Sequence, residues 1–172
     1  MTDYHASKLV LRALEPGDID LLYLWENEPD MWRYGFSPAP LSRHQIWEYI
    51  TQYDANPLAT GQLRLMMQVD DKTVGAIDIY NLDMRNRHAF IGIMTATEFR
   101  KKGYASRALH LISDYCRYNL GLEQIVATVA EDNVPSMALF NKCGFTQVAS
   151  LPRWIMAGSK KFISANVLTK YL

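Results

Sequence analysis

Residues 100–106 read Arg100-Lys101-Lys102-Gly103-Tyr104-Ala105-Ser106, and this stretch lies between an apolar, strand-like run and an amphipathic, helix-like pattern. Three cationic side chains and one glycine therefore stand where a helix begins. A helix N-terminus carries unpaired N–H groups and about half a positive charge. Such a place binds phosphate through backbone amides, and glycine lets the backbone approach the ligand closely. The stretch predicts a ligand that contains a pyrophosphate.

The segments on either side of this stretch predict a βαβ unit, with strand 88–95, helix 104–118 and strand 124–130. Such a crossover joins parallel strands and is nearly always right-handed. Upstream, residues 63–69 and 73–82 have strand patterns and should form an antiparallel meander with strand 88–95. The expected fold class is α/β (mixed α+β), a mixed sheet with helices on both faces.

Capping and turn residues place the remaining elements. Asp18 is the expected N-cap of a first helix, and Ser42 with Gln45 three residues later makes a capping box for a second helix. Prolines and glycine indicate loops over 29–41 and 57–61. The other expected elements are strand 8–14, a helix from Pro135 to about Cys143, and strands near 145–151 and 161–169.

The bulk composition excludes several classes of protein. Lys+Arg and Asp+Glu are each 18, so the net charge is zero, whereas a general nucleic-acid binder would be basic. The 172 residues, 49% of them hydrophobic, match one domain over 1–172. Cys116 and Cys143 read as core thiols in a reducing compartment. The N-terminus has no signal-peptide pattern and no apolar run spans a membrane, so we expect a cytoplasmic protein without a membrane partner.

Two motifs identify a family. The phosphate motifs G-x-x-x-x-G-K-[ST] and G-x-G-x-x-G are absent. Instead, Arg100 to Ala105 fits R/Q-x-x-G-x-G/A, and a second element follows from Asn133 to Phe145. On these residues the chain resembles the GNAT superfamily of acyl-coenzyme A N-acyltransferases, which implies a mixed sheet of six to seven strands around the βαβ unit. It looks most like the branch of spermidine and diamine acetyltransferases and ribosomal-protein-alanine acetyltransferases, and residues 27–34 are similar to the polyamine enzymes.

The resemblance implies acetyl-CoA as co-substrate, no metal, and specific contacts. Backbone amides of residues 101–106 would hold the pyrophosphate, and backbone groups of Ile93 and Thr95 would pair with the pantetheine arm like an added strand. Asn133 would bond the pantetheine region or, alternatively, only cap a helix. Lys142 would reach a phosphate or the adenosine, or is simply an exposed helix-end cation. The implied coenzyme-binding residues are Ile93, Thr95, Arg100, Lys101, Lys102, Gly103, Ala105, Ser106, Asn133 and Lys142.

The implied reaction is direct attack of an amine on the acetyl thioester, so the amine must first lose a proton. An alkylammonium group with a pKa of about 10.4 is only about one part in 10³ neutral at pH 7. Polyamine-type members often carry Ala-Glu in the strand before the phosphate loop, but here the glutamate position is Phe90. Asp78, on the strand face opposite Ile77 and Ile79, is the candidate that binds or deprotonates the acceptor. The alternatives are an exposed aspartate or one paired with a nearby arginine.

The expected general acid is also missing. Many family members have a tyrosine seven residues after the motif asparagine, which protonates the departing thiolate, and here that position is Phe140. A thiol with a pKa of about 8.5 leaves as thiolate at a cost of about 2 kcal/mol near neutrality, within reach of a positive helix end. Ser136 is a candidate weaker donor, and the alternative is an ordinary first-turn helix serine.

Acidic residues suggest the acceptor. Residues 15–30 contain six carboxylates and no Lys or Arg, and in this superfamily the first helix and its loop border the acceptor cleft. The cluster favours a cationic amine, and nearby aromatic side chains could hold an ammonium group. The candidate acceptor-binding residues are Glu28, Trp32, Tyr34 and Asp78. The expected function is acetyl transfer to a primary amine such as a polyamine. A protein or peptide N-terminus, an aminoglycoside and a non-catalytic acyl-CoA-binding module are the alternatives, and a homo-oligomer stays open.

Overall fold

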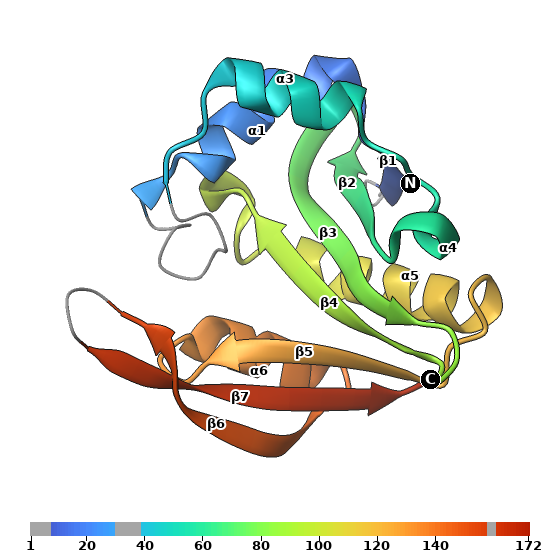
Figure 1. The fold of residues 1–172 in the computed structure, drawn as a ribbon, viewed down its shortest axis with the longest axis vertical. Helices are drawn as coiled ribbons and strands as arrows, with labels where there is room; N and C mark the ends of the chain where they lie inside the picture. The colour runs from blue at the N-terminus through green and yellow to red at the C-terminus, as the bar shows by residue number, and fades with distance from the viewer. Residues whose placement is uncertain (1–7, 30–38, 158–160) are drawn as a thin grey trace, which may run out of the picture.

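The computed structural model describes residues 8–29, 39–157 and 161–172 (Figure 1). Its sheet has seven strands in the order β1-β2-β3-β4-β5-β7-β6. The strands are β1 Leu9–Ala13, β2 Leu63–Val69, β3 Lys72–Asp83, β4 His88–Thr95, β5 Gln124–Ala130, β6 Thr146–Met156 and β7 Phe162–Tyr171. The helices are η1 Pro16–Asp18, α1 Ile19–Glu26, α3 Arg43–Thr51, α4 Pro57–Thr60, η2 Thr97–Phe99, α5 Tyr104–Tyr118 and α6 Val134–Lys142.

The sheet confirms the predicted fold class. Strands β2, β3 and β4 pair antiparallel as a meander, and β4 and β5 pair parallel across helix α5. This mixed arrangement is the βαβ unit and sheet that the sequence predicts. The capping box of Ser42 and Gln45 also forms at the start of α3.

Alternation along β3 supplies two cores, one on each face of the sheet. Ile77 and Ile79 pack with Leu109 and Ile112 of α5 in the larger core. On the opposite face, Ala76 packs with α1 and α3 in a smaller core. The predicted side of Asp78, opposite Ile77 and Ile79, is therefore confirmed, and its carboxylate lies on the α1 and α3 face.

Strands β4 and β5 separate partway along their length (Figure 1). Their pairing runs from His88 opposite Gln124 to Phe90 opposite Val126 and ends there. β4 continues to Thr95, while β5 continues to Ala130 paired with β7. Among the described strands, the β5-facing edge of residues 91–95 therefore has no partner. The N–H and C=O groups of this edge have no strand partner there, and apart from the Thr95 carbonyl, which accepts a hydrogen bond from Arg100 Nε, they are available to an extended ligand.

Two local predictions need correction, and a third holds only in part. Residues 57–60 form the short helix α4, because Asn56 caps it and Gly61, at φ 72°, ends it. Asp18 is the N-cap residue of α1, as predicted, but its side chain makes no capping hydrogen bond to that helix. Both final strands extend beyond their predicted bounds, since β6 and β7 pair with each other along most of their lengths.

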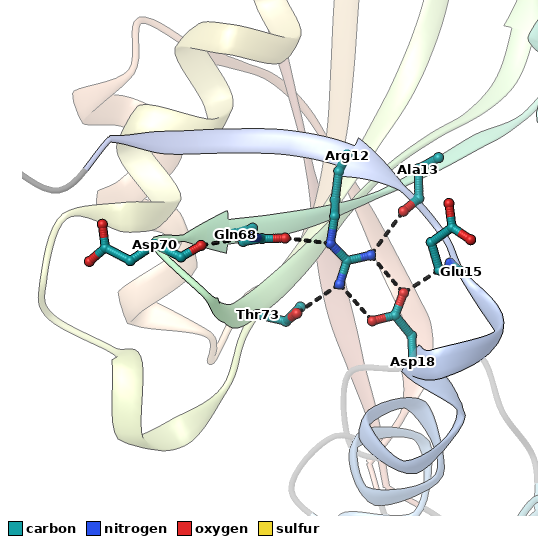
Figure 2. A network of polar contacts seen from close by, with 7 residues as sticks. All are labelled: Arg12, Ala13, Glu15, Asp18, Gln68, Asp70 and Thr73. Atoms are coloured by element: carbon teal, nitrogen blue, oxygen red, sulfur yellow. Dashed lines mark hydrogen bonds and ion pairs between the residues drawn. The ribbon is translucent and has the colours of Figure 1, made fainter.

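Asp18 instead anchors a buried ion pair (Figure 2). It is only 3% exposed, and its two carboxylate oxygens each accept a 2.7 Å hydrogen bond from the Arg12 guanidinium. The Glu15 N–H donates to the same carboxylate at 2.9 Å. Arg12 also donates to Gln68 and Thr73 of the neighbouring strands. The pair thus fixes the start of α1 against the edge of the sheet.

We expect this pair to make unfolding sensitive to acid. Burial alone would raise the pKa of Asp18, but the Arg12 guanidinium and the Glu15 N–H together hold that pKa below its usual range. The stabilisation is therefore fully present above the unfolded-state pKa of about 3.9 and is lost as the pH falls through the lower folded-state value. Urea unfolding at pH 5 and pH 3 should show a larger loss in the wild type than in Asp18→Asn. Equal losses in both proteins would contradict the role of the pair.

Candidate active site

The start of α5 has the geometry of an anion site. Gly103 is the N-cap at φ 79°, Lys101 before it is also at positive φ, and no described side chain caps the helix. A Cβ added at Gly103 would meet nothing within 4 Å, so this surface is open. The first-turn N–H groups of residues 104–106 have no intrahelical acceptor. The backbone therefore presents donors to an open surface that also carries the helix dipole.

The side chains of this loop take different directions. The Arg100 Nε donates to the Thr95 carbonyl at 3.1 Å, so it ties the loop to the end of β4. Lys102 Nζ lies 5.2 Å from the centre of the Phe99 ring. The Ser106 hydroxyl lies 3.3 Å from the Cys143 sulfur, so Ser106 can offer a ligand its backbone N–H while its side chain faces α6. Ala105 is partly buried behind the loop.

The predicted pantetheine edge is where β4 leaves β5. Ile93 pairs with Ile77 and Thr95 pairs with Gly75, all on the β3 side. Both residues lie past the last β4–β5 pair. Ile93 and Thr95 thus lie at the end of β4. Along the chain, η2 and the loop of residues 100–103 connect this end of β4 to the start of α5.

Helix α6 holds Asn133, Ser136 and Lys142. The Asn133 Oδ1 accepts from the Ser136 N–H at 3.3 Å, so Asn133 does cap the helix. Ser136 is a partly buried first-turn serine, and Lys142 is an exposed cation in the last turn. Phe140, in the position of the family tyrosine, is buried and its ring packs on Phe145 with centroids 4.9 Å apart. Contacts of the first three residues with a coenzyme stay predictions.

Asp78 is paired with an arginine, which was one of the alternatives. Arg64 of β2 lies directly opposite it. The Arg64 Nε donates to Asp78 Oδ1 at 2.7 Å and its Nη2 to Oδ2 at 3.1 Å. The Arg64 Nη1 lies 3.2 Å from Oε1 of Glu26 at the end of α1. The Asp78 carboxylate is therefore half-buried and fixed in orientation by Arg64. Its proposed contact with an acceptor amine has to use carboxylate lone pairs that do not accept from Arg64.

Tyr49 of α3 and Tyr53, just past the end of that helix, complete this cluster. The Arg64 backbone N–H donates to the Tyr53 hydroxyl, and the Arg64 guanidinium lies 5.6 Å from the centre of the Tyr49 ring. Burial raises the pKa of Tyr49 to about 12 and also raises the pKa of Tyr53. Burial alone would lower the pKa of Arg64, but Asp78 and Glu26 hold it above the usual value. The sequence analysis counted Glu26 among the six carboxylates of residues 15–30 but did not connect it with Asp78, and it missed Arg64 and both tyrosines as members of this site.

The other acceptor candidates lie at the end of α1. Glu28 and Glu98 line a cavity of about 330 Å³ between α1 and η2, and the Thr97 hydroxyl donates to Glu28 at 3.3 Å. Trp32 and Tyr34 lie outside the described residues. Glu28 and Asp78 therefore belong to two different acidic places: Glu28 lines this cavity, and Asp78 lies in the Arg64 cluster with Glu26.

Three further observations concern metal binding, membrane-spanning helices and disulfides among the described residues. Across these ranges, no three His, Cys, Asp or Glu side chains gather as a metal site would require. None of the helices in the described part of the chain is long and apolar enough to cross a membrane. Cys116 and Cys143 are buried free thiols.

Comparison with known proteins identifies the family. Residues 8–146 match the model of the acetyltransferase (GNAT) domain. Spermidine N(1)-acetyltransferase of Vibrio cholerae is 27% identical over 146 residues, covering 84% of this chain and 83% of that protein. YdaF of Bacillus subtilis, provisionally named a ribosomal N-acetyltransferase, is 28% identical, covering 81% of this chain and 78% of its own length.

The fold has the same relatives. The crystal structure of Vibrio cholerae spermidine N-acetyltransferase in complex with CoA and spermine superposes with a TM-score of 0.84 at 23% identity, covering 95% of each chain. The predicted enzyme class and family are thereby confirmed. The chain belongs to the GNAT family of acetyltransferases, enzymes that use acetyl-CoA as co-substrate.

Proposed function

We propose that the protein transfers acetyl from acetyl-CoA to a primary amine of a small cationic molecule such as a polyamine, by direct attack. The observation that carries this proposal is the unpartnered edge of β4, which leads to open, uncapped donors at the start of α5. An acidic cluster lies on the α1 and α3 face of the neighbouring strands β2 and β3. The spermidine specificity named for the Vibrio cholerae relative supports a polyamine acceptor.

The residues fit the coenzyme in three places. The pyrophosphate would accept hydrogen bonds from the N–H groups of residues 101–106, where Gly103 leaves the surface open. The two pantetheine amides would pair with the backbone of Ile93 and Thr95 as an added strand. The Asn133 Oδ1 already accepts the capping hydrogen bond from the Ser136 N–H, so a contact of Asn133 with the pantetheine would use its Nδ2 group as a donor. Lys142 and Arg100 would supply positive charge near the phosphates.

The reaction has to remove protons from the amine and stabilise the coenzyme A thiolate as it leaves. The ammonium group first loses one proton, to water or to Asp78, and the neutral nitrogen then bonds to the acetyl carbon. As the carbon–sulfur bond breaks, coenzyme A leaves as thiolate, and the nitrogen gives its second proton to water or to that thiolate. A backbone N–H near Thr95 would stabilise the oxyanion. The family tyrosine is replaced by the buried Phe140, so the departing sulfur would leave as thiolate near the positive end of α5, with Ser136 as a weaker donor.

Asp78 on β3 is the residue that we propose binds or deprotonates the acceptor amine. We expect Asp78→Asn to lower kcat/KM for a cationic amine by about tenfold or more, because the variant keeps the shape but loses the charge that attracts ammonium. Thiol release under steady-state conditions measures this change. Turnover equal to the wild type would exclude Asp78 from the reaction.

The coenzyme loop gives a separate prediction. Both Asp and Asn tolerate positive φ, so Gly103→Asp and Gly103→Asn should fold alike. We expect Gly103→Asp to weaken acetyl-CoA binding by about tenfold or more, because a carboxylate would stand beside the pyrophosphate. Gly103→Asn, which has the same shape without charge, should weaken binding distinctly less. Calorimetric titration of both variants with acetyl-CoA measures these affinities. A Gly103→Asp protein with wild-type affinity would show that the coenzyme phosphates do not bind at this loop.

The acceptor class is tested by thiol release with a panel of amines. Spermidine and putrescine should be turned over with higher kcat/KM than a peptide with a free N-terminal alanine or an aminoglycoside. Preference for the peptide would favour the ribosomal activity named for the YdaF relative. Tight acetyl-CoA binding without turnover of any amine would contradict the proposed reaction.

A further inference from the structure

Two aromatic rings lie side by side on the α1 and α3 face of the sheet. Tyr80 of β3 is directly opposite Phe90 of β4, and their ring centroids are 5.6 Å apart with the ring planes tilted by 36°. Both side chains are half-buried. Neither ring belongs to the two hydrophobic cores that the described residues form. The pair is therefore an apolar surface that contributes little to the packing of those cores.

The rings lie where β4 separates from β5. Phe90 opposite Val126 is the last β4–β5 pair, so the unpartnered edge of β4 begins at the next residue. The pantetheine amides are proposed to pair with Thr95 and Ile93 of this edge, so the coenzyme arm would run from the phosphate loop toward the rings. The aromatic pair is thus at the end of the edge that lies farther from the phosphate loop.

The proposed acceptor carboxylate is next to the rings. Asp78 and Gly92 are the neighbouring cross-strand pair on the same face, and two residues along a strand span about 7 Å. A Cβ added at Gly92 would lie 3.6 Å from the Tyr80 ring and 3.9 Å from the Asp78 Cβ, so a larger residue there would cover both. Glycine places no side chain over the surface between the carboxylate and the rings.

An apolar surface beside a carboxylate fits an acceptor that has the same two parts. An alkylamine carries an ammonium group, which Asp78 attracts, and a methylene chain, which gains free energy when it leaves water for an apolar surface. The faces of aromatic rings also attract ammonium groups. An aminoglycoside or a peptide carries polar groups beside its amine, and these groups would lose hydrogen bonds to water against the rings.

We propose that Phe90, together with Tyr80, is a specificity-determining residue that binds the methylene chain attached to the reacting nitrogen, so that the acceptor is an amine on an unbranched hydrocarbon chain. This inference rests on the proposed function and narrows its acceptor class. Asp78 would bind the amine at one end of the surface, and the rings would keep water from the chain at the other end.

Two diamines of equal length and charge test the apolar contact. Cadaverine is an unbranched diamine, and its ether analogue has an oxygen atom in place of the central methylene group. The wild type should turn over cadaverine with a kcat/KM about tenfold higher, because the ether oxygen would lose hydrogen bonds to water against the rings. The oxygen also lowers the pKa of both amines, so ionisation favours the ether analogue and does not produce this preference.

Substitutions of Phe90 should change the preference between the two diamines. Phe90→Ala should raise the KM for cadaverine about tenfold, change kcat by less than about threefold, and reduce the preference to about threefold or less. Phe90→Leu keeps an apolar side chain and should retain most of the preference, whereas the polar Phe90→Gln should lose it. A purely structural role of Phe90 would lower the turnover of both diamines alike and leave their ratio unchanged.

Tyr118→Ala is the matched control, because it removes an exposed aromatic ring at the C-terminal end of α5. This variant should keep the wild-type kinetics with both diamines. Thermal unfolding of each variant, with and without acetyl-CoA, verifies folding and coenzyme binding. If Phe90→Ala does not fold, the wild-type ratio and the comparison of Phe90→Leu with Phe90→Gln still decide.

The outcomes separate this inference from the proposed function. Equal kcat/KM for the two diamines in the wild type, or an unchanged ratio in Phe90→Ala, would overturn the role of Phe90 and leave acetyl transfer to amines intact. A wild type that acetylates a peptide or an aminoglycoside but neither diamine would also overturn it. A wild type that binds no acetyl-CoA, or that acetylates no amine, would overturn the proposed function itself.

Discussion

Arg12→Met is expected to destabilise the protein by about 3–5 kcal/mol, because it leaves the Asp18 carboxylate buried without its cation. Asp18 is 3% exposed, and both of its oxygens accept bonds from Arg12. The Glu15 N–H would remain as its one other hydrogen bond in the network of Figure 2. Urea unfolding at pH 7 measures the change in the free energy of unfolding.

A similar pair on the surface is the control for this prediction. Arg43 and Asp20 also form an ion pair at α1, but their side chains are 59% and 73% exposed. Arg43→Met should therefore change stability by about 1 kcal/mol or less. The double variant Arg12→Met with Asp18→Asn should recover part of the loss, since it removes the buried charge. Equal effects of Arg12→Met and Arg43→Met would contradict the account of the buried pair.

Gly75→Ala is expected to cost about 3 kcal/mol or more and to weaken acetyl-CoA binding in the protein that still folds. A Cβ at this position would lie 2.2 Å from the Met94 carbonyl oxygen and 3.0 Å from the Thr95 Cα. Both contacts are with backbone, so no side-chain rotation relieves them, and overpacking of this kind displaces the strand. The displaced strand is the end of β4, where the coenzyme is proposed to pair.

Gly17→Ala is the matched control for Gly75→Ala. A Cβ at Gly17 meets nothing within 4 Å, and its φ is not positive. Its stability should be unchanged or raised by up to about 1 kcal/mol, and its coenzyme affinity should stay at the wild-type value. Thermal unfolding and calorimetry measure both properties. A Gly75→Ala protein as stable as Gly17→Ala would show that β3 and β4 can separate at this point without cost.

The coenzyme side of the site could be predicted from the sequence because its signals are local. Gly103 and the cations before it stand within one short stretch, and the strand and helix around them follow from periodicity. The capping role of Asn133 is equally local and was one of the two readings given for it. The separation of β4 from β5 was not predicted, since no residue of either strand signals where their pairing ends. Family resemblance implied only that the backbone of Ile93 and Thr95 pairs with the pantetheine arm.

The acceptor side could not be predicted because it depends on register. After the turn at residues 70–71, strict pairing of β2 with β3 would put Arg64 opposite Ile77. The register shifts by one residue between Met67 and Gln68, and Arg64 lies opposite Asp78 instead. A one-residue shift changes which side chains share a face. Glu26 of α1, Tyr49 of α3 and Tyr53 just past the end of α3 then contact Arg64 only because α1 and α3 pack on the sheet.

The most direct test of the central claim is a crystal structure of the protein with bound coenzyme A. We predict that the pyrophosphate lies within hydrogen-bond distance of the backbone N–H groups of residues 101–106, and that the pantetheine amides pair with the β5-facing edge of β4 between Ile91 and Thr95. Coenzyme found elsewhere on the sheet, or crystals and solutions that take up none, would contradict that claim.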